Sequence, residues 1–148
     1  MRLEEEIKQI KFHSQNHKAI VNVIYTCNWL LYKFCKVLKP FGLSPQQYNV
    51  LRILRGHNPE PIGVNEITER MLDKMSNVSR LVEKLRKKGL AERKINKTDR
   101  RGVEIFITEK GLVLLAELDK PEYGLEQIES LNETEAIEMN LLIDKIRG

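Results

Sequence analysis

Basic residues concentrate in one short stretch of this chain. Between positions 80 and 101 the sequence carries ten lysines and arginines against three acidic residues, although the formal net charge of all 148 residues is only +4. After Gly102 the balance reverses, and acidic residues predominate toward the C-terminus. Localised charge selects the face that meets a polyanion, whereas a uniformly basic surface binds polyanions indiscriminately. The pattern therefore favours phosphate binding by one surface.

The first part of this stretch has the periodicity of a helix. In the segment 76–90, apolar side chains recur at helical spacing and form one stripe, and most polar side chains fall off it. Lys87, Lys88 and Gly89 predict the end of the helix, because cations suit its negative end and glycine suits the C-cap. A shorter helical pattern, 64–71, precedes it. The stripe consists of Val78, Leu81, Val82 and Leu85.

Two strand-like runs follow, 90–95 and 103–107, and a loop of mostly cationic residues joins them. A helix of suitable size for the major groove, followed directly by a cationic hairpin that can reach the backbone or the minor groove, suits duplex DNA. A solvated helix beside an ordinary charged hairpin is the alternative. The ordered combination of the two elements favours DNA.

The hairpin carries a specific signature, Asp99-Arg100-Arg101 followed by Ile107-Thr108-Glu109-Lys110-Gly111. It resembles the wing of the MarR family (multiple antibiotic resistance regulators), and the similarity extends to the segment 44–54 and the helical flanks. The sequence departs from the family pattern at Leu72, where the turn usually carries glycine, and at Thr68, where alanine is usual. Because leucine adopts a left-handed backbone only at a cost, the turn is expected to take a different local path.

The resemblance implies a mostly α fold with a small β-wing. The expected organisation is a single domain, 1–148, with a winged helix-turn-helix at 44–107 and helical dimerisation regions at 4–38 and 109–148. One long helix is expected from about Glu4 to Leu38, broken by the Lys39–Gly42 segment. Ser44 is expected to cap the next helix and Asn132 the last one. Intrachain packing is the alternative to dimerisation for the apolar stripes of the terminal helices, formed by Ile20, Ile24, Leu31, Met139, Leu142 and Ile146.

Contacts to DNA bases are expected near the start of the second helix, where asparagine suits adenine and arginine suits guanine. The residues concerned are Lys74, Ser76, Asn77 and Arg80, with Ser79 on the same face. Phosphate contacts, which carry no sequence information directly, are expected from Lys84, Lys87, Lys88, Arg93, Lys94 and Lys97. The resemblance implies that Arg101 approaches the minor groove, held by Asp99, with Arg100 in the same DNA-binding set.

The remaining chemistry-bearing residues suggest no further site. Cys27 and Cys35 lie eight residues apart in one predicted helix, about 12 Å along its axis, which is too far for a disulfide; both are expected to be buried as small apolar residues. The reactive cysteine of peroxide-sensing family members corresponds to a position near Ile20, so that chemistry is unsupported. The three histidines lack a ligand cluster, and neither a metal nor a cofactor is expected.

Several classes of protein are disfavoured. No apolar run approaches the roughly 20 residues that span a bilayer, and the charged N-terminus is unlike a signal peptide, so a cytoplasmic protein with no membrane partner is expected. The sequence contains neither a glycine-rich phosphate loop nor a nucleophile elbow, which argues against an enzyme.

The sequence thus predicts a homodimeric regulator of transcription that binds double-stranded DNA at a pseudo-palindromic operator. By resemblance it is more often a repressor than an activator, released by a small phenolic or lipophilic effector. Two alternatives stay open: a winged-helix adaptor that binds protein through the same basic face, and a ligand sensor whose DNA affinity is secondary.

Overall fold

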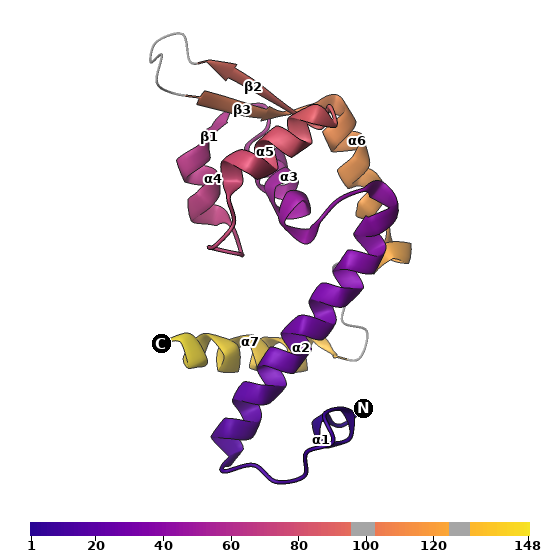
Figure 1. The fold of residues 1–148 in the computed structure, drawn as a ribbon, viewed down its shortest axis with the longest axis vertical. Helices are drawn as coiled ribbons and strands as arrows, with labels where there is room; N and C mark the ends of the chain where they lie inside the picture. Colours follow the sequence, from indigo (N-terminus) through magenta and orange to yellow (C-terminus); the bar gives the residue numbers. More distant parts are fainter. Residues whose placement is uncertain (96–102, 125–130) are drawn as a thin grey trace. The chain divides into compact units, whose positions relative to one another are not determined.

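A computed structural model describes residues 1–95, 103–124 and 131–148. Helices make up most of the described chain, and three short strands form one sheet (Figure 1). This confirms the predicted fold class, mostly α with a small β-wing. The elements are α1 (Leu3–Glu6), α2 (Gln15–Leu38), η1 (Lys39–Phe41), α3 (Pro45–His57), β1 (Ile62–Gly63), α4 (Val64–Arg70), α5 (Val78–Lys87), β2 (Ala91–Ile95), β3 (Val103–Ile107), α6 (Glu109–Leu118), η2 (Pro121–Tyr123) and α7 (Glu133–Arg147).

The chain forms two compact units, Met1–Leu115 and Ala116–Gly148. The hydrophobic core lies in the first unit, where helices α3, α4 and α5 pack with the sheet. Its fully buried members come from all of these elements and include Val50, Leu51, Leu54, Ile62, Ile67, Met71, Leu85 and Ile105. The core therefore fixes α5 and the sheet on one framework. In contrast, α2 buries only Leu38, and α7 buries no side chain in this chain.

The N-terminal helix is not continuous, so the prediction of one helix from about Glu4 to Leu38 is wrong. Helix α1 ends at Glu6, Lys8 adopts a left-handed backbone with φ 53°, and α2 begins only after Ser14. The Ser14 hydroxyl accepts a hydrogen bond from the His17 amide at 3.1 Å, which caps α2 and favours a new helix start. The α1 segment folds back on α2, where the Tyr25 hydroxyl donates to Glu6 at 2.8 Å.

Several helix boundaries agree with the sequence prediction because local capping sets them. Ser44 and Gln47 form a reciprocal capping box at the start of α3, with hydrogen bonds of 3.0 and 3.2 Å. Asn132 and Glu135 do the same at the start of α7. Gly42 ends the α2–η1 segment in a left-handed conformation, as expected for the break at residues 39–42.

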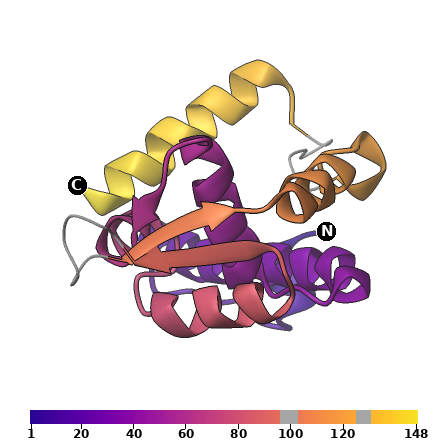
Figure 2. The same ribbon diagram turned by 90° about the horizontal axis from the view of Figure 1, so that it is seen from above.

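The sheet has the order β1-β3-β2, and both pairs are antiparallel. The β2–β3 hairpin was predicted, whereas β1 was not: its two residues place Ile62 opposite Ile105 and Gly63 opposite Glu104. Figure 2 shows the two hairpin strands running in opposite directions beside α5. Strand β1 leads directly into α4, so the sheet also positions the first helix of the helix-turn-helix.

Candidate nucleic-acid interface

Helix α5 has one buried face and one cationic face. Val78, Val82 and Leu85 are buried against the core, and Leu81 is half-buried, so the predicted apolar stripe is confirmed. Arg80, Lys84 and Lys87 are exposed at positions i, i+4 and i+7, which places them on one side of the helix. Because the apolar side chains of α5 are buried on one side and the cations are exposed on the other, the cationic stripe is available to a partner.

The C-terminal end of α5 is fixed by several hydrogen bonds. Gly89 adopts φ +70°, and the Leu90 amide donates to the Leu85 carbonyl at 3.0 Å, which is the C-cap geometry that glycine favours. The Lys88 ammonium donates to the Gly42 carbonyl and lies 3.5 Å from Gln47 Oε1. Lys88 was expected to contact phosphate. The residue is half-buried and its ammonium is directed to these internal acceptors, so a contact of Lys88 with phosphate stays a prediction.

Asn77 is the N-cap of α5. Its Oδ1 accepts a hydrogen bond from the Arg80 amide at 3.0 Å. Bidentate recognition of adenine by asparagine uses this oxygen as an acceptor and the amide nitrogen as a donor. The capping bond uses one lone pair of this oxygen, and the expected adenine contact of Asn77 stays a prediction. The residue also fixes the start of the helix from which Ser79 and Arg80 project.

The turn between α4 and α5 follows a path that needs no left-handed backbone at Leu72. Met71 leaves α4 in an extended conformation, and Leu72 has no positive φ. The Leu72 amide donates to Asn49 Oδ1 on α3 at 2.9 Å, and the Met75 amide donates to Asp73 Oδ1 at 3.0 Å. This outcome confirms the expectation for Leu72. The hydrogen bond from the Met75 amide holds the pKa of the Asp73 carboxyl below its usual value, with help from Gln46.

Two expected base contacts lie in this turn. The Lys74 ammonium donates to the Glu69 carbonyl at 2.6 Å, at the end of α4, although the residue is exposed. Ser76 is half-buried, and its amide donates to the Asp73 carbonyl at 3.2 Å. Both residues therefore support the turn itself. Of the residues expected near bases, Ser79 and Arg80 are the ones exposed on α5.

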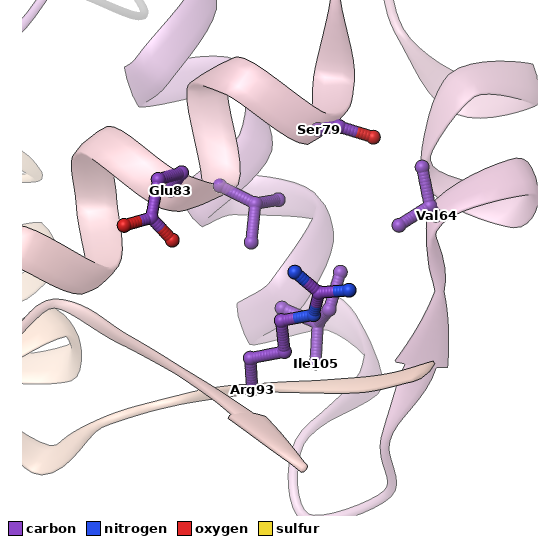
Figure 3. A pocket seen from close by; sticks show the side chains of 6 residues that line it. Val64, Ser79, Glu83, Arg93 and Ile105 are labelled. Carbon is purple, nitrogen blue, oxygen red and sulfur yellow. The ribbon is translucent and has the colours of Figure 1, made fainter. Parts of the chain in front are cut away.

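The side chain of Arg93, on strand β2, extends toward α5. The sequence did not indicate this position. It lines a cavity of about 120 Å³ together with Ser79, Glu83 and Val64. Figure 3 shows its guanidinium pointing from β2 toward the side chains of α5 and the start of α4. The Glu83 carboxylate accepts two hydrogen bonds of 2.9 Å from Arg86, which lowers the pKa of Glu83, and the charge of Arg93 contributes in the same direction. Arg93 thus brings the hairpin and the helix into one charged surface.

Lys94 lies on the other face of the hairpin. Its ammonium is 4.7 Å from the centroid of the Phe106 ring and 3.6 Å from the Glu92 carboxylate, so it is held close to the sheet while exposed. The remaining expected wing contacts, Lys97, Asp99, Arg100 and Arg101, lie outside the described residues.

The ITEKG motif connects the hairpin to the core. Thr108 Oγ1 donates to the Gly89 carbonyl at 2.7 Å and accepts from the Gly111 amide at 3.1 Å. A Cβ atom on Gly111 would lie 2.5 Å from the Leu90 carbonyl oxygen and 2.7 Å from Ile107 Cγ1. Only glycine permits this approach of α6 to the segment that follows α5. The motif therefore fixes the base of the hairpin.

The expected dimerisation residues are uncovered in this chain. On α2, Ile20, Ile24 and Leu31 are 44 to 57% exposed. On α7, Met139, Leu142 and Ile146 are 37 to 63% exposed. Packing among the described residues therefore does not cover these side chains, and the stripes remain available to another subunit.

The expectation that the cysteines are buried is wrong for this chain: Cys27 and Cys35 are both free and exposed. Cys27 lies three residues after Ile24 and four before Leu31, and Cys35 lies four residues after Leu31, so both are on the same side of α2. They share the exposure of that stripe, over which none of the described residues packs. Elsewhere in the described ranges, no group of three potential metal ligands occurs, and no helix there is long and apolar enough to cross a membrane.

Comparison with known proteins places this architecture in a family. The family model described as MarR matches residues 41–102. The crystal structure of a MarR transcription factor from Planctomyces limnophilus is 30% identical and superposes with a TM-score of 0.69, covering 93% of this chain and 98% of that one. The HTH-type transcriptional regulator MgrA of Staphylococcus aureus is 28% identical over 94% of this chain and 88% of its own length.

A third relative is known in complex with a ligand. The structure of CouR from Rhodococcus jostii RHA1 bound to p-coumaroyl-CoA is 25% identical, with a TM-score of 0.71, and the match covers 91% of this chain and 95% of that one. The similarity in each case extends well beyond the helix-turn-helix to the helical flanks. The chain belongs to the MarR family of winged-helix transcriptional regulators.

Proposed function

We propose that this protein is a transcriptional regulator that binds double-stranded DNA sequence-specifically through α5 and the β2–β3 hairpin. The single observation that carries the proposal is the cationic stripe of Arg80, Lys84 and Lys87 on the exposed face of α5, opposite a face that is fixed in the core. A helix presented in this way fits the width of the major groove. Its membership in a family of HTH-type regulators supports the same function.

The exposed side chains divide by role. Arg80 lies near the start of α5 and contacts base edges, with guanine as the preferred partner of its guanidinium. Lys84 and Lys87 lie farther along the helix and contact phosphates, which position the protein without reading sequence. Arg93 and Lys94 extend the phosphate contacts to the hairpin. Contacts from Lys97, Asp99, Arg100 and Arg101, including entry of Arg101 into the minor groove, remain part of the proposal by resemblance to the family wing.

The functional unit that we propose is a homodimer of single-domain subunits. Residues 44–107 form the DNA-binding region, and residues 4–38 and 109–148 form the dimerisation region. The uncovered apolar side chains of α2 and α7 support this assembly. Two copies of α5 related by a two-fold axis would address half-sites roughly 34–36 Å apart on a pseudo-palindrome.

Regulation by a small molecule completes the proposal. The protein acts in the cytoplasm as a repressor that leaves its operator when a phenolic or lipophilic effector binds, and it has no enzymatic activity. Support for this class of effector comes from the similarity to CouR, whose structure contains p-coumaroyl-CoA.

Selection of bound duplexes from a random DNA pool tests the function directly. The protein is expected to enrich a pseudo-palindromic sequence. Arg80→Ala should then cost about 1–3 kcal/mol on that duplex and relax the base preference at one position per half-site. Lys84→Ala should weaken all duplexes about equally and reduce the salt slope by about one.

A pool without enrichment, or binding that is insensitive to salt, would contradict the proposal. If Lys84→Ala changed the base preference and Arg80→Ala did not, the roles assigned to these two residues would be reversed.

A further inference from the structure

Two large apolar side chains are almost fully exposed in the turn between α4 and α5. Leu72 is 87% exposed and Met75 is 93% exposed. An isolated exposed apolar residue is common on protein surfaces. Here, two occur within four residues, on the segment that leads directly into α5, and Met75 lies two residues before the N-cap Asn77. Such a pair indicates a contact surface.

The turn presents these side chains from a fixed backbone. The amide of Leu72 is anchored to Asn49 on α3, and that of Met75 is anchored to Asp73. The Lys74 ammonium is anchored to the Glu69 carbonyl. Each of these anchors engages a polar group with another part of the protein, so the exposed apolar side chains are the groups that remain for a partner. In Figure 1 the connection between α4 and α5 projects from the helices that it joins.

The position of the turn identifies the partner, given the proposed function on which this inference rests. The turn is continuous with the N-terminal end of α5, from which Arg80 projects toward bases. In the major groove the only apolar group on a base edge is the C5-methyl group of thymine, and cytosine presents an amino group in its place. We propose that Met75 and Leu72 contact thymine C5-methyl groups and thereby distinguish thymine from cytosine beside the bases that α5 reads.

The energetics of this contact set its expected size. Burying one methyl group changes an affinity by roughly threefold to fivefold. Because hydrogen bonds already fix the backbone of the turn, binding costs little conformational entropy there. Little of the affinity gained by burying the methyl group is therefore offset. A contact of this kind depends on the methyl group and not on the phosphate charge, so it is separable from the contribution of Lys84 and Lys87.

Replacement of thymine by deoxyuridine removes only the methyl group and tests the inference. A duplex selected from a random pool by the full-length protein is synthesised with each thymine replaced in turn. The unmodified protein is expected to lose roughly threefold to fivefold affinity at one or two positions per half-site. Met75→Ala and Met75→Gln should bind the thymine and deoxyuridine duplexes equally at one such position, and Met75→Leu should restore the difference. Leu72→Ala should act at a neighbouring position.

Lys84→Ala is the control, because Lys84 is exposed on α5 and is proposed to contact phosphate, so this substitution should weaken both duplexes by the same factor. This variant should retain the full difference between thymine and deoxyuridine. The inference is overturned if the unmodified protein binds both duplexes equally, or if the difference persists in both Met75→Ala and Leu72→Ala. A pool from which no duplex is selected overturns the proposed function and this inference together.

Discussion

At the scale of single residues, the candidate site contains two kinds of polar side chain. Some form hydrogen bonds that fix the backbone of the protein, and others are charged and exposed to a partner. Asn77, Lys88 and Lys74 all have side chains suited to DNA, and each is bonded to the protein itself. Arg80 and Lys84 project from the helix that these contacts hold in place. Residue type alone therefore does not show which of these side chains also hold the backbone of the protein.

Gly111→Ala is expected to destabilise the protein by about 1–3 kcal/mol, because its Cβ would overlap the backbone carbonyl of Leu90, which cannot move without displacing the end of α5. Gly56→Ala provides the matched control. Gly56 lies in α3 with no atom within 4 Å of an added Cβ, so alanine there should stabilise by about 0.5–1 kcal/mol. Urea unfolding measures both. Equal effects of the two substitutions would contradict the role assigned to Gly111.

Asp73 gives a prediction for pH. Its folded pKa lies below the ordinary value of 3.8 because the carboxylate accepts the Met75 amide, so folding favours the ionised form. The resulting stability is present at neutral pH and is lost as pH falls below 3.8 through the folded pKa. Unfolding free energies of the unmodified protein and Asp73→Ala should therefore differ at neutral pH and converge in acid. A difference that stays constant with pH would mean that ionisation of Asp73 does not contribute.

At the scale of elements, the turn between α4 and α5 depends on α3. Asn49→Ala should remove the acceptor of the Leu72 amide, accelerate hydrogen exchange at that amide and weaken operator binding, while the far-ultraviolet circular dichroism stays unchanged. Asn65→Ala, on the exposed face of α4, is the control and should change neither quantity. Unchanged exchange at Leu72 in Asn49→Ala would show that the turn is fixed by its own residues.

Local sequence signals predicted most of the elements. Caps at Ser44 and Asn132, the stripe of Val78, Val82 and Leu85, and Gly89 after α5 act over four residues or fewer, and each appears in the structure as expected. Strand β1 has only two residues, too few to show a period, and it exists through its pairing with β3. The break after α1 was missed because the apolar patch near Ile7 and Ile10 continued the helical pattern.

The candidate site was predictable in its cations but not in their contacts. The stretch from Arg80 to Lys94 was recognisable from charge and periodicity. Whether a given side chain or amide faces solvent or the protein depends on residues distant in sequence. The Lys88 ammonium donates to the Gly42 carbonyl, and the Leu72 amide donates to Asn49 Oδ1. No spacing rule within α5 or the turn encodes such pairings. The exposure of Leu72 and Met75 likewise could not be predicted without knowing the path of the turn.

At the scale of the whole molecule, assembly is the main expectation. Leu142→Glu should dissociate the proposed dimer, because burial of an unpaired charge costs several kcal/mol. Asn140→Glu adds the same charge to another side of α7 and should leave the dimer intact. Light scattering at micromolar concentration distinguishes the two species. An unmodified protein that is monomeric under these conditions would contradict the proposed architecture.

Thiol labelling gives an independent measure of the same assembly. Cys27 and Cys35 are exposed in the isolated chain and lie on the apolar stripe of α2. A second subunit that covers this stripe should slow their reaction with a thiol reagent, and Leu142→Glu should restore fast reaction. Equal labelling rates in the two proteins would mean that the cysteine side of α2 stays in solvent in the dimer.

The hydrogen bond between Lys88 and Gly42 has a consequence for communication along the subunit. Gly42 directly follows η1 at the end of α2, and Lys88 directly follows α5. The Lys110 ammonium donates to the Lys88 carbonyl at 3.0 Å, which extends the connection to α6. We expect a displacement of the end of α2 to move the end of α5 as well, because these hydrogen bonds join the two. If α5 reads the operator as proposed, we expect the Lys88 contacts to affect how strongly an event at the long helix changes affinity for the operator.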